Sequence, residues 1–188
     1  MTIVLVILLL IILVLAVCVF FYFVSTQRRL VTLDENCKNA LGQIEVQLNS
    51  RWDVLLALAK TASKYAEHES QTLINVISQR RQGGITTAQD VTRQEGEISS
   101  IMSRLMAISE AYPELKADRL YQETMAGVKQ YEENVRMSRM VYNDSATLLN
   151  RAVRQWPSSF IASMLNFRER EYLKTDEEQK KGMPQIFE

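Results

Sequence analysis

The hydrophobic residues of the chain form one continuous run and three periodic stretches. The run extends from Ile3 to Val24 and contains no charged side chain. At about 1.5 Å per residue, a helix over this run would be roughly 33 Å long, which is enough to cross a hydrocarbon core of about 30 Å. The run therefore predicts one membrane-spanning helix, and residues 1–27 are assigned to a transmembrane anchor.

A cleaved signal peptide and a lipoprotein signal are the alternatives to an anchor. A signal peptide needs a basic start, a shorter apolar core and a cleavage site between small residues, and the run has none of these. The segment from Leu15 to Cys18 resembles a lipidation box. However, Val17 stands where a small residue is needed, and the chain stays apolar as far as Val24. These features favour an uncleaved anchor.

Beyond the run, apolar side chains recur every three or four residues, which is the spacing of helices that pack side by side. The three periodic stretches cover about residues 28–66, 70–112 and 118–156, and the pair Gly83-Gly84 allows the second stretch to form two helices. The periodicity places Trp52 and Trp156 on the apolar faces. We therefore predict an all-α protein, in which an N-terminal transmembrane helix leads into an elongated antiparallel bundle of three to four helices.

Alternating helix directions predict where the connections of this bundle lie. Three stretches of nearly equal length would return the turn from Tyr112 to Asp118 to the bilayer. The connection around His68 and the segment after Pro157 would then lie far from the bilayer. Residues 28–167 are assigned to the bundle, and residues 168–188 are assigned to a polar C-terminal tail.

Capping residues predict several helix starts. Asp118 is a predicted N-cap, and Thr86 with Gln89 three residues later fits a capping box. Ser158 or Ser159 would cap an amphipathic helix of about ten residues. We interpret this helix as a lid on the open end of the bundle, and a partner-binding helix is the alternative.

Positive and negative side chains balance, with 22 of each and no stretch dominated by one sign. A nucleic-acid-binding surface needs a basic stripe, so nucleic acid is not a predicted partner. Arg28, Arg29 and Lys38 follow the run, whereas Met1 and Thr2 before it carry no charged side chain. An excess of Lys and Arg marks the cytoplasmic side. This favours a single-pass cell-membrane protein with a cytoplasmic domain, and an extracytoplasmic domain is the alternative.

The sequence offers few groups for catalysis or metal binding. His68, the only histidine, lies between two glutamates without the second histidine of a zinc-protease helix, and we predict that it is solvated. Cys37 is interpreted as a small buried residue, with a disulfide across a dimer as the alternative. We therefore predict no enzymatic activity, no cofactor, and no catalytic, cofactor-binding or metal-binding residue.

Short motifs spread over about residues 30–187 carry a family resemblance. The most specific is Ala111-Tyr112-Pro113-Glu114-Leu115-Lys116, and the others are Tyr142-Asn143-Asp144, Pro157-Ser158 and the trio Arg51, Asp53 and Leu55. Together these motifs resemble the LemA family of bacterial membrane-anchored helical proteins.

The chain departs from the family pattern at three places. Leu56-Ala57 stand where relatives commonly carry Pro-Asn, Asn166-Phe167 stand where they carry Gly-Phe, and Leu149-Asn150 replace a second Tyr-Asn pair. Leucine and alanine favour a helix more than proline does, so the first departure is compatible with the predicted fold.

The resemblance implies an anchored helical bundle of poorly defined role, and some relatives are implicated in building membrane compartments or lie beside membrane proteases. We interpret the chain as a non-enzymatic membrane-anchored scaffold or adaptor. An accessory regulator of a membrane enzyme, such as a membrane protease, is the alternative. The expected partners are the lipid bilayer and either a membrane protein or a second copy of this chain. Tyr112, Glu114 and Lys116 are the candidate partner-contact residues, because a tight turn requires Pro113 but does not require Glu114 or Lys116. The alternative is that Tyr112 and Leu115 only pack the end of the bundle.

Overall fold

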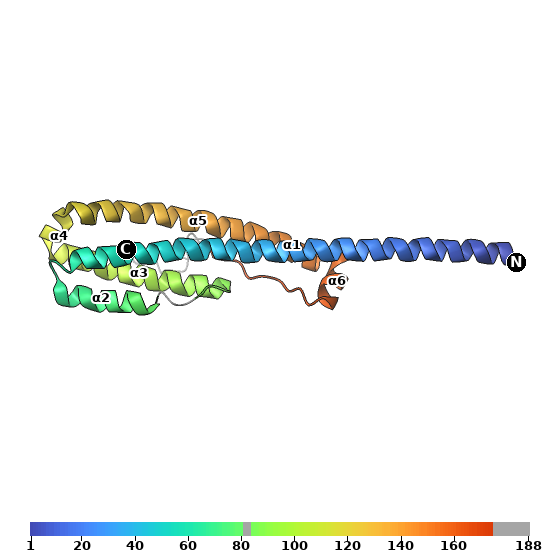
Figure 1. The fold of residues 1–188 in the computed structure, drawn as a ribbon, viewed down its shortest axis with the longest axis horizontal. Coiled ribbons are helices and arrows are strands. Elements are labelled where there is room, and N and C mark those ends of the chain that lie inside the picture. The colour runs from blue at the N-terminus through green and yellow to red at the C-terminus, as the bar shows by residue number, and fades with distance from the viewer. Residues whose placement is uncertain (81–83, 175–188) are drawn as a thin grey trace, which may run out of the picture. The chain divides into compact units, whose positions relative to one another are not determined.

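The structure, a computed structural model, describes residues 1–80 and 84–174 (Figure 1). The described residues form helices joined by short connections, which confirms the all-α prediction. The helices are α1 (Thr2–Ala62), α2 (Glu67–Arg80), α3 (Ala88–Ala111), α4 (Pro113–Ala117), α5 (Arg119–Arg154) and α6 (Ser158–Met164). The chain forms two compact units. The first comprises Met1–Cys37 and Asp144–Arg170, and the second comprises, among the described residues, 38–80, 84–143 and 171–174.

The second unit is a four-helix bundle in which α1, α2, α3 and α5 alternate in direction (Figure 1). A Cβ atom at Gly84, after the end of α2, would lie 3.8 Å from Oε1 of Glu45 on α1, so α2 has run back along α1. On α3, the side chain of Gln94 meets Trp52. The antiparallel bundle predicted from the sequence is therefore confirmed, with the second stretch divided into two helices.

Residues at the predicted apolar positions form the core of this bundle. Trp52 is only 1% exposed, and its indole Nε1–H donates to Oε1 of Gln94 at 3.4 Å. This hydrogen bond explains the polar Gln94 in the apolar stripe of α3, because a buried indole N–H needs an acceptor. The other buried stripe residues of this unit include Leu41, Ile44, Leu48, Leu55, Leu58, Val91, Ile98, Ile101, Leu105, Val128 and Val135.

The predicted placement of the two helical turns is wrong. The sequence predicts that the connection near His68 and the Tyr112 to Asp118 turn lie at opposite ends of the bundle. In the structure, the Tyr65 hydroxyl donates to Oδ2 of Asp118 at 3.1 Å, so the two turns lie at the same end. The break between α2 and α3 adds one more reversal of direction than three unbroken stretches would have.

Two helix starts show how capping residues fix the bundle's connections. Asp118 accepts from the backbone N–H of Tyr121 at 3.1 Å, which confirms it as a cap for α5 and lowers the pKa of its carboxyl. The capping box of α3 is one residue later than predicted, because Thr87 is the N-cap and Asp90 is its partner. Hydrogen bonds from the Thr87 hydroxyl and the Thr86 N–H hold the pKa of Asp90 well below its usual range.

The first unit contains the apolar run. By length and composition, α1 can cross a membrane, and every residue from Met1 to Tyr22 is exposed. Burial on α1 begins just after the run, where Thr26 is 8% exposed and Leu30 is fully buried. The last turns of α5 and the short helix α6 belong to the same unit. Protein packing in this unit therefore starts where the apolar run ends.

Helix α6 differs from its prediction at its N-terminus. Its N-cap residue is Pro157, and no side chain caps it. The Ser158 hydroxyl instead points back to α5 and donates to the carbonyls of Ala152 and Gln155, each at 2.7 Å. Neither predicted serine cap is present. The Ser158 hydroxyl is engaged by carbonyls at the end of α5 instead.

The C-terminal end of α6 explains one departure from the family pattern. Asn166 adopts a φ of 60°, in the left-handed region that favours glycine and tolerates asparagine best among other residues. The N–H of Phe167 bonds to the carbonyl of Ala162, and the N–H of Asn166 bonds to that of Ser163. These two bonds form a Schellman motif. Asparagine thus performs the conformational role for which the family pattern uses glycine.

Candidate functional site

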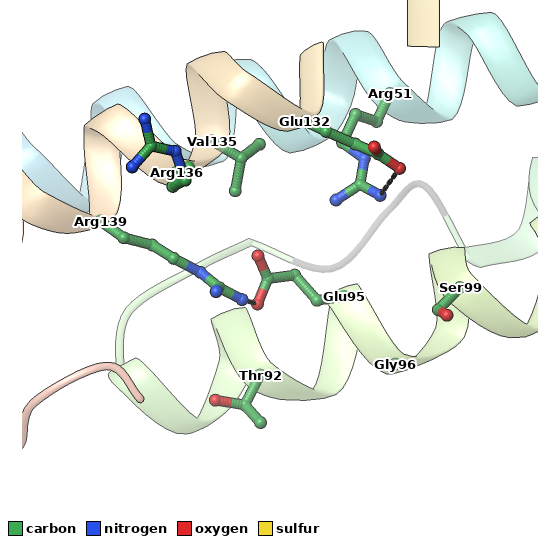
Figure 2. Close-up of a pocket in the computed structure, with 9 residues that line it drawn as sticks. All are labelled: Arg51, Thr92, Glu95, Gly96, Ser99, Glu132, Val135, Arg136 and Arg139. Atoms are coloured by element: carbon green, nitrogen blue, oxygen red, sulfur yellow. Dashed lines mark hydrogen bonds and ion pairs between the residues drawn. The ribbon is translucent and has the colours of Figure 1, made fainter. Parts of the chain in front are cut away.

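A groove on the second unit gathers charged residues from three helices (Figure 2). Its volume is about 510 Å³. Helix α1 contributes one residue, α3 contributes four and α5 contributes four. The lining residues are Arg51, Thr92, Glu95, Gly96, Ser99, Glu132, Val135, Arg136 and Arg139.

Ion pairs across the groove tie the three helices together. Figure 2 shows Arg139 of α5 and Glu95 of α3 pointing toward one another, with their side chains only 11% and 12% exposed. Nη2 of Arg51 on α1 lies 3.6 Å from Oε1 of Glu132 on α5. The Arg139 pair is largely shielded from water, where a charge–charge interaction is screened less than at the surface. The groove's carboxylates are therefore held by arginines from other helices.

The groove has open space beside Gly96. A Cβ atom built on Gly96 would meet no other atom within 4 Å, so the α3 backbone faces empty space there. Glycine inside a helix costs about 1 kcal/mol relative to alanine. The periodicity of the sequence did not indicate this groove, because its residues other than Val135 lie outside the apolar stripes. The signals available were a glycine within α3 and three arginines among the acidic residues of α1, α3 and α5.

Two asparagines on α5 each hold an extended backbone segment by a pair of hydrogen bonds. Nδ2 of Asn143 donates to the carbonyl of Leu173 at 2.8 Å, and the N–H of Leu173 donates back to Oδ1 at 2.9 Å. Asn150 makes the same two bonds with the carbonyl and N–H of Arg170, at 2.9 and 2.7 Å. The side-chain amide thus pairs with the backbone as a neighbouring strand would. Residues 170–173, which the sequence analysis assigned to a polar tail, are packed on α5.

These asparagines give a structural meaning to a motif that the sequence analysis noted only as a resemblance. The Tyr142 hydroxyl also donates to the backbone, at the carbonyl of Glu171. Leu149, which replaces the second tyrosine, is fully buried. The asparagine is thus present in both pairs, whereas the tyrosine is present in only one.

The predicted partner-contact residues lie on the turn around α4. Leu115 is fully buried and anchors this turn, whereas Glu114 and Lys116 are exposed and Tyr112 is half-buried. The turn lies beside Tyr65, just beyond the end of α1. The two charged side chains are therefore accessible, and their role as partner contacts stays a prediction.

The remaining chemical candidates lie apart from the groove's lining. His68 is exposed, as predicted. Cys37 is 1% exposed and carries a free thiol, whose pKa is raised by burial, which confirms its interpretation as a buried residue. Within residues 1–80 and 84–174, no cluster of three or more His, Cys, Asp or Glu side chains is arranged to hold a metal ion.

Comparison with known proteins places the chain in a family. The sequence model of the LemA family matches residues 40–187. The chain belongs to the LemA family. Among curated proteins, LemA of Metamycoplasma hominis is 24% identical over 149 residues, which cover 78% of this chain and 68% of that protein. The match and the apolar part of α1 describe a membrane-associated helical protein.

Magnetosome proteins are also similar to this chain over part of its length. Magnetosome protein MamQ of Magnetospirillum gryphiswaldense is 31% identical over 78 residues, or 42% of this chain. Magnetosome protein MamQ 2 of Paramagnetospirillum magneticum is 28% identical over a segment of the same length. The matched segment covers 29% of each magnetosome protein, so this chain spans less than a third of those relatives.

Proposed function

We propose that this LemA protein is a non-enzymatic scaffold or adaptor, anchored in the cell membrane by one pass of α1. The bundle would act by presenting its charged groove to a membrane protein or to a second copy of the chain. This proposal rests on the pairing of the groove's two carboxylates with arginines of other helices. Glu95 and Glu132 are engaged by arginines from neighbouring helices, so they fix the shape of the surface.

Recognition, more than catalysis, suits such a surface. A carboxylate that acts as a general base must be within reach of a substrate proton. In this groove, Glu95 is paired with Arg139 and Glu132 with Arg51, so each carboxylate is engaged by an arginine (Figure 2). A groove with a fixed pattern of both signs suits a partner of complementary charge, since such patterns give specificity.

Affinity purification of the tagged full-length chain from gently solubilised membranes tests this proposal. We expect mass spectrometry to identify a membrane protein without catalytic activity, or mostly further copies of this chain. An enzyme recovered in equal amount would favour the regulator alternative. Recovery of the chain alone as a monomer would contradict the scaffold role.

We also propose that the bundle lies on the cytoplasmic side. Arg28 and Arg29 follow the apolar run and are exposed, whereas residues 1 and 2 carry no charged side chain. Protease added to intact cells should therefore leave the bundle uncut, and it should cut the bundle once the membrane is permeabilised. Digestion in intact cells would place the bundle outside.

The turn that carries Tyr112, Glu114 and Lys116 is proposed as a second contact with a protein partner. Exposed charges on a turn anchored by buried Leu115 are accessible without disturbing the core. A photo-reactive residue at Glu114 should then cross-link to the same partner that the purification identifies. Cross-links to lipid alone would contradict a protein contact at this turn.

A further inference from the structure

The turn between α5 and α6 carries apolar side chains that the protein itself does not cover. Trp156 is 82% exposed and Phe160 is 72% exposed, and Met164, which lies four residues after Phe160 on the same face of α6, is also exposed. The sequence pattern predicted that Trp156 would be buried. It is exposed because α5 ends at Arg154, two residues before Trp156, and the Trp156–Pro157 turn leaves the buried stripe.

The lid predicted from the sequence is present only in part. On α6, Ile161 and Ala162 are buried, so this face packs on the rest of the first unit. Phe160, Met164 and Leu165, however, are exposed. Helix α6 therefore has an apolar face against the protein and further apolar side chains facing away from it. A helix that merely closed a bundle would leave the second group polar.

The position of this turn within the first unit identifies what covers it. Trp156, Pro157 and Ser158 line one groove of about 260 Å³ with the α1 segment from Tyr22 to Leu30. The apolar run ends within that segment, at Val24. At about 1.5 Å per residue, the whole segment is only about 12 Å long. The turn therefore lies within roughly 10 Å of the hydrocarbon boundary, at the depth of lipid headgroups.

We propose that α6 and the turn before it form a second membrane contact, in which Trp156, Phe160 and Met164 enter the interfacial layer of the bilayer that α1 spans. Tyr22 of α1 lines the same groove as Trp156, and its neighbours Phe20 and Phe21 in the apolar run are also exposed. Tryptophan and tyrosine favour this layer because one end of each ring is apolar and the other is polar.

Exposed basic side chains of the first unit suit the same surface. Arg29 lines the groove with Trp156. Arg28, Arg151 and Arg168 are also exposed in this unit, as are the acidic Glu35 and Glu169. Basic side chains beside a membrane anchor are attracted to anionic headgroups. The occupant of this patch is therefore a bilayer that contains anionic lipid. This inference rests on the proposed anchoring of α1, and it does not depend on the scaffold role.

The two tryptophans of the chain allow a direct test. The full-length protein is placed in vesicles of phosphatidylcholine and phosphatidylglycerol, with lipids brominated near the headgroup end of the acyl chain as quenchers. Trp156 should lose about half or more of its emission, since interfacial side chains reach roughly 5 to 10 Å into this layer. The Trp156→Phe variant should be barely quenched, because its remaining tryptophan, Trp52, is buried.

A second pair of variants tests the patch without changing either tryptophan. Phe160→Glu should reduce quenching of Trp156, whereas Val46→Glu, at an exposed apolar position of the second unit, should leave it unchanged. Equal reductions by both variants would overturn the assignment of the patch. Sensitivity to bromine near the chain end, but not near the headgroup, would overturn the interfacial depth.

The outcomes also separate failure of the contact from failure of the anchor. Release of the chain from the vesicles by alkaline carbonate would overturn the anchoring itself. Retention of the chain with weak quenching of the wild type would overturn the lipid contact alone. A blue-shifted but unquenched Trp156 would show that protein covers the patch, through a second copy or another partner.

Discussion

Replacing Trp52 with alanine is expected to lower the free energy of unfolding of the bundle by about 3 to 5 kcal/mol. The side chain is 1% exposed among the helices of the second unit, so its removal leaves a cavity. The change also removes the donor that Oε1 of buried Gln94 accepts from. Urea titration of the detergent-solubilised chain, followed by far-UV circular dichroism, measures the loss.

Two variants separate the contributions of volume and hydrogen bonding at Trp52. Trp52→Phe fills most of the cavity but gives no donor to Gln94, so it should cost clearly less than alanine. Trp52→Phe combined with Gln94→Leu should recover part of that cost, because neither polar group remains buried without its partner. An unchanged urea midpoint for Trp52→Ala would contradict the packing described for this core.

Asn143 and Asn150 each clamp the backbone by a pair of hydrogen bonds. Removing both clamps should release the segment around residues 170–173. In the double variant Asn143→Ala and Asn150→Ala, four hydrogen bonds to Arg170 and Leu173 are lost. Each clamp contributes about 1 to 3 kcal/mol to local stability, and a loss of this size corresponds to roughly five- to 150-fold faster amide exchange. Hydrogen exchange followed by mass spectrometry of peptides that contain Arg170 and Leu173 measures this change.

The same helix offers controls for the clamp experiment. Asn143→Asp keeps an acceptor for the N–H of Leu173 but loses the donor, so its effect should be intermediate. Oδ1 of Asn134 accepts a bond from the exposed side chain of Gln130, and Asn134→Ala should leave exchange at residues 170–173 unchanged. Equal exchange in the wild type and the double variant would contradict a holding role for the asparagines.

Helix content and burial could be predicted because they follow directly from periodicity. A repeat of three and four residues brings side chains such as Leu48, Trp52 and Leu55 to one face, and burying that face stabilises the bundle. The prediction for Trp156 failed because the repeat was continued past the end of α5. The apolar stripe predicts which face of a helix is buried, but it does not predict the residue at which the helix ends.

Connection topology and the candidate surfaces depend on information that periodicity does not carry. An apolar stripe is the same whether its helix runs up or down, so the extra reversal between α2 and α3 moved the Tyr112 to Asp118 turn to the other end of the bundle. The groove at Gly96 is lined by side chains from three helices, and no single stripe contains them. Asn143 and Asn150 bond to backbone N–H and C=O groups. Every residue other than proline carries both groups, so the sequence does not identify these partners.

The central claim, that the bundle acts as a scaffold through its charged groove, is tested most directly at Gly96. A Cβ atom there meets no neighbour within 4 Å, so Gly96→Ala adds its methyl group in open space. The alanine variant also favours the helix, whereas Gly96→Trp is designed to obstruct the groove that Gly96 lines. In affinity purification from solubilised membranes, we predict that the partner is retained by Gly96→Ala and lost by Gly96→Trp at equal amounts of bait. Equal recovery of the partner with both variants would contradict the claim.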